Sequence, residues 1–574
     1  GAASALGGRL APSPSGRWTT SPARPRPADL AGRTYDLCVV GGGINGVAVA
    51  RDAALRGLSV VLLERRDLSS GTSAWSSRIV HGGLKYLEHL EVGLVRECVR
   101  DRRELLRAAP HLVDRFPMLI PGFRGDRRPW WLIRLGVVAH DLLKGRDPFP
   151  RGRSLGRAAV ARLAPGLDLD ALRGATLYHD GQVTWAERLA IELALDAAAA
   201  GADVVTRAEV TGFVTEGDRV TGVRVRDTAP DADGAVVHEV HARAVVNAAG
   251  PWVDAVLAHG VPGPRRIGGT KGSHVVVDRF EGAPEVCTFF EAHADGRPMY
   301  LMPWAGRLLI GTTDLTFEGE LDDLAASDDE IAYLLDETNR LYPDAALTEA
   351  DVLYSYAGVR PLPAMPGVTD NAKIPREHVI VDHAPTHRGL VSALSGKWTT
   401  HRALAEDVLA AAGRSAGMDV GRPATHGRPL PGAVAGPART ALEADLVARL
   451  GVPADAATRL VDVYGARAVR LVDLVAADPA LAEVVDPETG ALAAEVVLAA
   501  REEWAHTTAD VLMRRSMVGF NGEAGAGAAA RVAAVLGAEL GRDAAAVAAD
   551  LADFARERAR LRPRTPLPEA VAAG

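Results

Sequence analysis

The chain has 574 residues, of which 48% are hydrophobic and 24% charged, and a formal net charge of -8 at pH 7; this composition is typical of a soluble globular protein and gives no electrostatic reason to expect nucleic acid binding. The length predicts two or three domains, because one hydrophobic core stops growing well below this size. Three cysteines without a CxxC pair argue against a metal site or a disulfide framework and favour a reduced intracellular protein, and no apolar stretch is long enough to span a bilayer.

The first 34 residues differ in composition from the rest of the chain. Pro, Ser, Gly and Arg dominate them, and Asp29 is their only acidic residue. Such a segment cannot bury a core, so we expect residues 1–34 to be a disordered N-terminal extension. A transit peptide shares its many arginines and few acids, but this segment has no apolar stripe.

Residues 35–64 read as a Val-rich and Leu-rich strand, a glycine turn, a helix and a second buried strand. Gly41, Gly43 and Gly46 form a GxGxxG motif between the first strand and the helix. In a dinucleotide site the first glycine allows the tight turn, the second lets a pyrophosphate approach, and the third packs the helix on the strand. Glu64 closes the second strand, where an acidic side chain accepts ribose hydroxyls. The segment predicts a Rossmann-like dinucleotide-binding domain.

The six residues "HGGLKY" at 81–86 place three reactive side chains on a flexible backbone. The glycines allow the chain to approach a ligand closely, and the His, Lys and Tyr side chains are able to hold an anion or move a proton. A surface turn is the alternative.

Two helical patterns follow, at residues 94–109 and 130–143. In the second, Trp131, Leu135, Val138 and Leu142 lie at helical spacing. We favour a core helix with one solvated face, and a helix lying on a membrane surface is the alternative.

Short strands with a period of two are predicted from residue 202 to residue 246, with an acidic glycine turn at "EGDR". The segment "ARAVVNAAGPWVD" at 242–254 then brings the backbone of Ala249 and Gly250 close to a flat or anionic group. Alone, it is a strand and a turn. Paired with the glycine motif, it looks like the second dinucleotide contact of two-domain flavoproteins, and FAD becomes the favoured cofactor.

The remaining chain divides into three parts. Strands with polar ends are predicted between residues 267 and 381, at "KGSHVVVD", "RLLIGTTD" and "HVIVDHA". Gly and Pro crowd residues 413–437 and indicate a linker. Residues 438–562 are Ala-rich and helix-periodic, so we expect a separate helical domain there, with a tail at 563–574.

Eight motifs occur in an order that resembles the FAD-dependent glycerol-3-phosphate dehydrogenase family: "GGGINGVAVARDAALRGLSVVLLE", "SSRIVHGGLKYLE", "APHLV", "NAAGPWVD", "KGSHVVV", "LIGTTD", "YSYAGVRPL" and "SGKWTTHRALAE". The resemblance runs from Tyr35 to Asp407, and "EEWAHTTADVLMRRS" is similar to that family's helical C-terminal domain. It implies an α/β fold with a Rossmann-like FAD-binding domain of the two-domain, amino-acid-oxidase-like type, a mixed-sheet substrate domain and a C-terminal all-helical domain. The FAD part is expected at about 35–120, 180–260 and 375–412, and the substrate part at about 121–179 and 261–374.

The resemblance also implies an activity, namely oxidation of sn-glycerol 3-phosphate to dihydroxyacetone phosphate, with electrons passing from FAD to membrane quinone. It further implies a peripheral protein on the cytoplasmic face of the cell membrane, and a homodimer is possible. Two alternatives stay open: a glycerol-3-phosphate oxidase that uses oxygen, and a non-catalytic flavin-binding or RNA-associated protein.

The residues that match the family's motifs give the candidate substrate site. Such a reaction needs a base for the hydroxyl proton and cations for the phosphate. The candidates for phosphate or hydroxyl contacts are Lys85, Tyr86, Arg360 and Arg376, and the catalytic candidates are His81, His111, His274 and Lys397. Which histidine takes the proton is left open, and a solvated surface arginine is the alternative for Arg360 and Arg376.

Cofactor contacts are expected along several loops. Gly396 permits close approach before a helix that starts near Thr399, and the positive end of that helix would face the anionic ring of a reduced flavin. Hydroxyls of the loop at 72–77 are candidate donors to FAD. The candidate FAD-binding residues are Gly41, Gly43, Asn45, Gly46, Glu64, Thr72, Ser73, Ser77, Gly82, Val210, Ala249, Gly250, Trp252, Gly396, Lys397 and Thr399.

Overall fold

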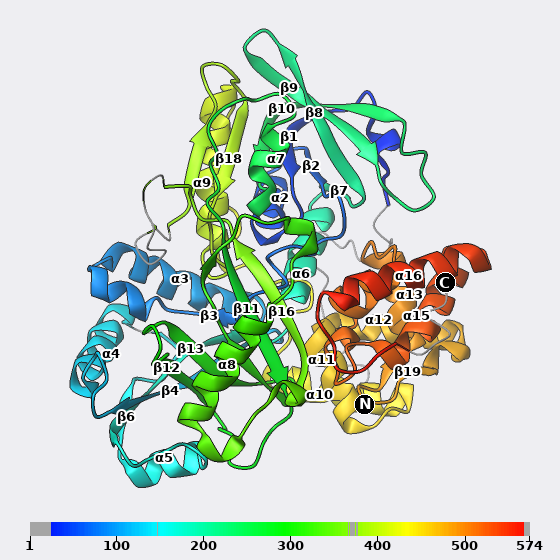
Figure 1. Ribbon diagram of the computed structural model, residues 1–574. Coiled ribbons are helices and arrows are strands. Elements are labelled where there is room, and N and C mark those ends of the chain that lie inside the picture. Colours follow the sequence, from blue (N-terminus) through cyan, green and yellow to red (C-terminus); the bar gives the residue numbers. More distant parts are fainter. Residues whose placement is uncertain (1–23, 146, 366, 368–373, 375–376, 568–574) are drawn as a thin grey trace.

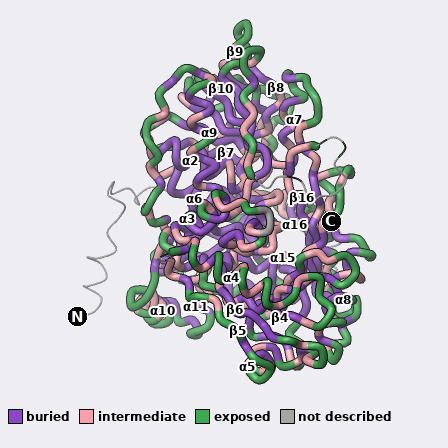
Figure 2. Tube along the Cα trace, turned by 90° about the vertical axis from the view of Figure 1, so that its left-hand side faces the viewer, coloured by how far each residue is buried: buried purple, intermediate pink, exposed green. Residues whose placement is uncertain are grey.

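The computed structural model describes residues 24–145, 147–365, 367, 374 and 377–567. Two β-sheets follow one another down the molecule, and a helical domain built from the last part of the chain lies beside the lower sheet (Figure 1). The central strands of both sheets run through the buried interior, whereas the turn beside β9 is exposed (Figure 2). This arrangement agrees with the fold class predicted from the sequence.

The first sheet has the order β17-β18-β10-β1-β2-β7, with the hairpin β8–β9 joined to β10. Its central strands are parallel and consist of Val and Leu runs, because both of their faces are covered. One face is covered by α2 (Ile44–Leu55), α6 (Ala186–Ala199) and α9 (His401–Ala416), and the other by α7 (Val253–Leu257) and the hairpin. The strands are β1 (Thr34–Val40), β2 (Val60–Leu63), β7 (Asp203–Val205), β8 (Ala208–Glu216), β9 (Arg219–Asp227), β10 (Val237–Asn247), β17 (Val379–Asp382) and β18 (Leu390–Leu394).

The second sheet has the order β15-β11-β14-β13-β12-β4-β6-β3, with β16 paired to β11 and β5 to β6. Helices α5 (Arg157–Leu163) and α8 (Asp328–Leu341) cover one face, and α3 (Val92–Ala108), α4 (Trp130–Lys144) and the helical domain contact the other. The strands are β3 (Ile79–Val80), β4 (Val113–Phe123), β5 (Arg153–Leu155), β6 (Leu172–Val183), β11 (Thr270–Val277), β12 (Cys287–Glu291), β13 (Pro298–Trp304), β14 (Arg307–Gly311), β15 (Leu315–Thr316) and β16 (Val352–Arg360).

The C-terminal domain consists of helices and one short hairpin. Its core is continuous with the inner face of the second sheet, where the Tyr354 hydroxyl donates to the Phe520 carbonyl at 2.9 Å. The elements are α10 (Gly436–Leu450), α11 (Ala454–Tyr464), α12 (Val469–Ala477), α13 (Ala493–Glu502), α14 (Thr508–Asp510), α15 (Ala526–Glu539), α16 (Ala544–Ala559), a π-helical turn at Val511–Arg515, and the hairpin β19 (Val484–Asp486) with β20 (Ala491–Leu492).

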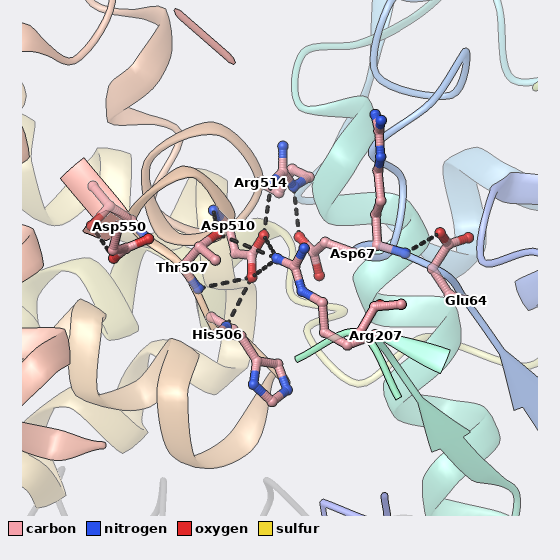
Figure 3. A network of polar contacts seen from close by, with 12 residues as sticks. Glu64, Asp67, Arg207, His506, Thr507, Asp510, Arg514 and Asp550 are labelled. Carbon is pink, nitrogen blue, oxygen red and sulfur yellow. Dashed lines mark hydrogen bonds and ion pairs between the residues drawn. The ribbon is translucent and has the colours of Figure 1, made fainter. Parts of the chain in front are cut away.

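Buried ion pairs join this domain to the first sheet (Figure 3). Arg514 and Arg515, neighbours on the π-helical turn, both bind the carboxylate of Asp67 in the loop after β2, with N–O distances of 2.6 Å and 2.7 Å. Arg207 from the β7–β8 loop binds Asp510 at 2.7 Å. A buried charge is tolerated only when it is paired and hydrogen-bonded, so this network requires the two domains to be in contact.

The structure corrects part of the disordered extension expected at residues 1–34. Residues 1–23 lie outside the described residues, but Pro27–Leu30 form a 3-10 helix and Leu30 is fully buried. Arg26 pairs with Asp227 at 2.8 Å, and Arg24 donates to the Ala505 carbonyl at 2.7 Å. Composition could not reveal these contacts, because one buried leucine and two long-range arginine contacts carry no local pattern.

The core-helix interpretation favoured for residues 130–143 is wrong. Trp131, Leu135 and Leu142 are 58%, 55% and 76% exposed. Trp130, their neighbour, packs instead against Gly122 and Gly174 of β4 and β6, so a different face of α4 is buried. The apolar stripe therefore faces outward, and periodicity alone could not show which face met the sheet.

Two boundaries differ from those expected. The second sheet contains β3, β4 and the end of β6, because β4 and β6 pair along nearly their whole length. The sequence instead predicts residues up to 120 and from 180 to lie in the FAD part. The segment predicted as a linker at 413–437 begins inside α9, and its irregular part is hydrogen-bonded to the first domain: the amide of Ala424 donates to Asp52 at 3.0 Å and that of Gly432 to Glu192 at 2.6 Å.

Candidate active site

A cavity of about 370 Å³ lies at the carboxyl ends of β1, β2 and β10 and extends to the second sheet. Ligands of open α/β sheets bind at this edge, where the strands end and loops begin. The cavity is lined by parts of the glycine turn, the loop at 70–77, the "HGGLKY" loop, the start of β8, the turn after β10, the end of β16 and residues 395–398. These segments include most of the motifs identified in the sequence.

The glycine turn is built as the motif requires. Gly41 has φ of +109°, and a Cβ there would lie 2.7 Å from the Ala248 carbonyl oxygen. A Cβ on Gly46 would lie 1.8 Å from the Gly41 carbonyl oxygen, so only glycine lets α2 pack on the turn. Helix α2 begins at Ile44 with its N-terminus at the cavity, and the positive end of a helix favours a phosphate.

Glu64 ends β2 at the cavity wall. Its carboxylate accepts hydrogen bonds from the amides of Gly42 at 2.6 Å and Arg66 at 2.8 Å, which fix its orientation. Burial raises its pKa. Each carboxylate oxygen keeps a second lone pair, which suits it to accept a ribose hydroxyl.

The opposite wall of the cofactor region comes from Val210 and from Ala249, Gly250 and Trp252. Gly250 has φ of +57°, and the guanidinium of Arg65 lies 4.8 Å from the Trp252 ring. Together with the glycine cradle and the α2 N-terminus, these walls fit an adenine dinucleotide.

Three predicted hydroxyl donors line the cavity but have protein partners. Ser73 accepts from the Ile44 amide at 2.9 Å, Thr72 donates to the Val359 carbonyl at 2.7 Å, and Ser77 bonds the His274 ring at 2.8 Å. Their hydroxyls therefore hold the loop at 70–77 in place.

The second sheet contributes a face on which aromatic rings alternate with glycines. Strands β11 and β16 are paired so that His274 lies opposite Tyr356 and Gly272 opposite Gly358. The rings of His274 and Tyr356 stack at 4.9 Å. A Cβ on Gly272 would lie 2.5 Å from the Arg360 guanidinium and one on Gly358 2.7 Å from the Trp75 carbonyl oxygen, so the two glycines make room for these neighbours. Burial and the Arg360 charge lower the pKa of His274 to about 3, so its imidazole is neutral near pH 7.

Arg360 ends the same strand and lines the cavity. Its guanidinium is oriented by Asp314 at 3.0 Å and by the Thr312 hydroxyl at 3.2 Å. A guanidinium held by its neighbours in this way is suited to bind a phosphate with two parallel hydrogen bonds.

The "HGGLKY" loop and Lys397 form the remaining wall. The ammonium groups of Lys397 and Lys85 lie 4.3 Å and 5.4 Å from the centre of the Tyr86 ring. Burial lowers the pKa of Lys397, and its Nζ has no hydrogen-bond partner among the described residues. Burial, then Lys85 and Lys397, hold the pKa of His81 well below 6.5. An ammonium without a partner and a neutral imidazole at one cavity point to an anionic ligand.

Gly396 has φ of +106°, and a Cβ there would lie 2.5 Å from the Asn45 amide nitrogen. That amide donates to the Ser395 carbonyl at 3.0 Å, while its oxygen has no hydrogen-bond partner in the described part of the chain. Thr399 is buried behind the wall, and α9 starts at His401, two residues after the predicted start. The turn at Ser395 and Gly396 therefore connects the glycine motif, through Asn45, to Lys397.

Some predicted residues lie elsewhere. His111 packs against Gly432 and Gly465 and does not line this cavity, so it is not part of the candidate site. Gly82 also lies outside the lining, and its amide donates to Asp180 at 2.6 Å. Arg376 lies outside the described residues.

Two residues of the site were missed in the sequence. Tyr356 stands four positions before Arg360 on one strand, and side chains at even spacing share a face, so this signal was present in "YSYAGVR". Asp314 lies in the quoted motif "LIGTTD", but no local pattern could pair it with Arg360, which is far away in sequence.

Comparison with known proteins decides the family. A family model for FAD-dependent oxidoreductases matches residues 36–402, and a model for the C-terminal domain of alpha-glycerophosphate oxidase matches residues 423–547. A glycerol-3-phosphate dehydrogenase from Synechocystis is 40% identical over 500 residues, covering 85% of this chain and 90% of that protein. The chain belongs to the FAD-dependent glycerol-3-phosphate dehydrogenase family.

One solved structure and one further relative are also similar to this chain. The crystal structure of a glycerol-3-phosphate dehydrogenase from Bacillus halodurans complexed with FAD matches with a TM-score of 0.76 and 25% identity, covering 94% of this chain and 97% of that one. A D-erythritol 1-phosphate dehydrogenase from Brucella abortus is 39% identical over 404 residues, covering 70% of this chain and 77% of that protein. The cofactor of this chain is therefore FAD, as the glycine cradle indicates.

Proposed function

We propose that the protein oxidises sn-glycerol 3-phosphate to dihydroxyacetone phosphate, with FAD as the hydride acceptor. The observation that carries the proposal is one cavity that combines the dinucleotide cradle with the cations of Arg360, Lys397 and Lys85 and with two neutral histidines. A phosphate ester with an adjacent hydroxyl matches these groups.

Arg360 is the proposed phosphate anchor, since Asp314 and Thr312 already fix its guanidinium. Lys397 supplies a second charge, desolvated by burial, which strengthens its attraction to an anion. Bound FAD supplies the hydride acceptor, and the chain's side chains bind and orient the substrate carbon toward it.

A base must remove the proton of the hydroxyl that becomes the ketone. His81 and His274 are both neutral and both line the cavity, so each is able to accept that proton. His81→Gln and His274→Gln distinguish them: loss of the base lowers kcat steeply, whereas loss of a positioning group mainly raises KM.

The test is the visible spectrum of the purified protein under anaerobic conditions, before and after sn-glycerol 3-phosphate is added. Bleaching of the flavin bands supports the substrate; an unchanged spectrum refutes it. D-erythritol 1-phosphate and glycerol are the comparison compounds. Faster bleaching by D-erythritol 1-phosphate would make that ester the substrate of the same oxidation. Equal bleaching by glycerol would show that the phosphate plays no part in substrate recognition.

We further propose a membrane quinone as the acceptor and a peripheral position on the cytoplasmic face of the membrane. The described part of the chain has no helix long and apolar enough to cross a bilayer. Helix α4 instead carries a row of exposed apolar side chains, including Trp131, Leu135 and Leu142, which supports interfacial attachment. The alternative acceptor is oxygen, and parallel oxygen-consumption and quinone-reduction assays separate the two.

Vesicle sedimentation tests the attachment. A Leu135→Glu/Leu142→Glu variant is expected to lose binding to anionic vesicles, because charged side chains resist burial in the interface. Leu315→Glu is the matched control, since Leu315 is 44% exposed on β15, away from α4. Equal binding of the wild type and the α4 variant would contradict the proposal.

A further inference from the structure

A small pocket of about 70 Å³ lies beside the candidate active site, where the two sheets and the helical domain meet. Residues 70–72, Trp75 and Trp252 line both spaces, so these residues form a shared wall. The other walls come from the β7–β8 loop, the end of β16, the π-helical turn and the end of α16. The phosphate-binding candidate Arg360 does not line this pocket.

Arginines dominate the charged groups of the pocket. Its lining contains two carboxylates, those of Asp67 and Glu557, and four arginines, namely Arg66, Arg207, Arg514 and Arg560. Figure 3 shows Asp67, Arg207 and Arg514 close together. Both carboxylates are already neutralised, because Asp67 pairs with Arg514 and Arg515 and Glu557 pairs with Arg514 at 2.7 Å.

The ion pairs around the pocket form a closed set with an excess of positive charge. When every ion pair among the described residues is followed outward from the lining, the set holds six guanidinium groups and four carboxylates. The arginines are Arg65, Arg66, Arg207, Arg514, Arg515 and Arg560, and the carboxylates are Asp67, Asp322, Asp510 and Glu557. Two positive charges are therefore uncompensated within this part of the chain.

Two of the lining arginines also have unused hydrogen-bond donors. Arg560 makes no hydrogen bond or ion pair with any residue that the structure describes. The Nε of Arg207 is buried and likewise has no acceptor among those residues. Burial lowers the pKa of Arg66, and the charges of Arg65 and Arg560 lower it further. Buried donors without acceptors, next to arginines that repel one another, indicate an anion that completes the site.

The size of the pocket restricts that anion. Its volume is about that of two molecules of liquid water, at roughly 30 Å³ each. It accommodates a tetrahedral oxyanion but not a nucleotide or a phosphorylated carbon chain. A guanidinium matches the oxygens of phosphate with parallel donors. Arg66, Arg207 and Arg560 come from three separate segments, so one tetrahedral ion is able to meet all three.

We propose that this pocket binds free phosphate, held by Arg66, Arg207 and Arg560 where the FAD-binding domain meets the helical domain. The ion links the loop after β2 to the end of α16. Because residues 70–72 and Trp252 also face the FAD cavity, an occupied pocket holds that wall in place and slows the release of FAD. The site is independent of which alcohol the protein oxidises.

Arg560→Ala tests the pocket, and Arg560→Gln repeats the test with most of the side-chain bulk retained. Neither change removes a hydrogen bond or ion pair to the described residues, and both relieve the repulsion on Arg66. Arg556→Ala is the matched control, because Arg556 lies on the same helix, is 71% exposed and lines neither space. Each variant is also made in an Arg360→Ala background, which removes the phosphate anchor proposed for the active site.

The first readout is equilibrium dialysis of labelled inorganic phosphate against the FAD-loaded protein, without substrate and at constant ionic strength in chloride. In the Arg360→Ala background we expect one bound phosphate, which Arg560→Ala and Arg560→Gln weaken by roughly tenfold or more and Arg556→Ala leaves unchanged. No bound phosphate in that background, or equal binding by the Arg560 and Arg556 variants, would overturn the inference. Equal displacement by unlabelled sn-glycerol 3-phosphate would overturn the assignment to the free ion.

The second readout is the rate at which FAD leaves the diluted protein, followed by flavin fluorescence. In the Arg360→Ala background, phosphate should slow the release by about fivefold or more relative to chloride, and this effect should disappear in the Arg560 variants. A rate that ignores phosphate, or that phosphate slows equally in all the variants, would refute the link to the cofactor wall. Since neither readout uses turnover, failure of the proposed oxidation would leave both results decisive.

Discussion

Truncation of Arg360 is the sharpest test of how the substrate is held. Arg360→Ala removes the guanidinium that the structure places in the cavity and leaves the Asp314 carboxylate, formerly 3.0 Å away, without that partner. Loss of charge-assisted hydrogen bonds costs about 1.5–3 kcal/mol, or roughly tenfold to over a hundredfold in kcat/KM. The Asp314 carboxylate, no longer neutralised, adds repulsion on the order of 1–3 kcal/mol if the phosphate binds at a separation of about 6 Å.

Two further variants divide these contributions. Arg360→Ala/Asp314→Asn removes the repulsion and should recover part of the loss, on the order of tenfold. Arg360→Lys keeps a charge but loses the two-pronged geometry, so it should fall between the wild type and alanine.

The assay is the concentration dependence of anaerobic flavin bleaching, with FAD content measured by absorbance in each variant. All variants should retain FAD, because Arg360 ends β16 of the second sheet, whereas the glycine turn belongs to the first. An Arg360→Ala protein with an unchanged apparent affinity for sn-glycerol 3-phosphate would remove this arginine from the site. A double variant weaker than the single one would refute the repulsion argument.

Three other predictions concern the cofactor, the domain contact and pH. Gly46→Ala would place a Cβ 1.8 Å from the Gly41 carbonyl oxygen, so the purified protein should contain no FAD by absorbance even after reconstitution; stoichiometric flavin would contradict this. Asp67→Asn leaves the buried Arg515 without its carboxylate partner, while Arg514 keeps Asp510 and Glu557, and should lower the free energy of unfolding by about 3–5 kcal/mol, measured by urea denaturation; a loss below about 1 kcal/mol would show that the network relaxes. His111 is buried with a pKa lowered to about 3 by burial and then by Arg188, so the unfolded chain binds its proton first and stability falls as pH drops from 6.5 toward 3. His111→Leu should flatten this slope by up to about 1.4 kcal/mol per pH unit, and an unchanged slope would show that the ring is protonated in the folded state.

The parts of the site that the sequence predicted are those with a local cause. A glycine with positive φ, a helix N-terminus and an acid at the end of a strand occur within 30 residues of one another, so the cradle of Gly41, Gly46 and Glu64 could be predicted. The same holds for Gly396, whose turn comes between a strand and a helix.

The parts that the sequence did not predict depend on pairing between distant segments. His274 meets Tyr356 because β11 and β16 align in one register, and a slip of one strand by one residue would turn one ring to the opposite face of the sheet. Helix α4 was misjudged for a related reason, since the glycines that accept Trp130 lie on two other strands. His111, in a motif of the family, packs at the contact with the helical domain instead of at the active site.

The paired arginines on Asp67 also bear on how the protein is made. Asp67 stands three residues after Glu64, and its partners arrive only when residue 515 has been synthesised. Until then, the loop that carries Asp67 and Glu64, the proposed ribose contact, lacks its countercharge, and the chain before Gly436 exposes the apolar face that the helical domain later covers. Tight retention of the flavin would then depend on the helical domain being in place, so a chain interrupted before Arg514 would hold the flavin weakly and be open to degradation.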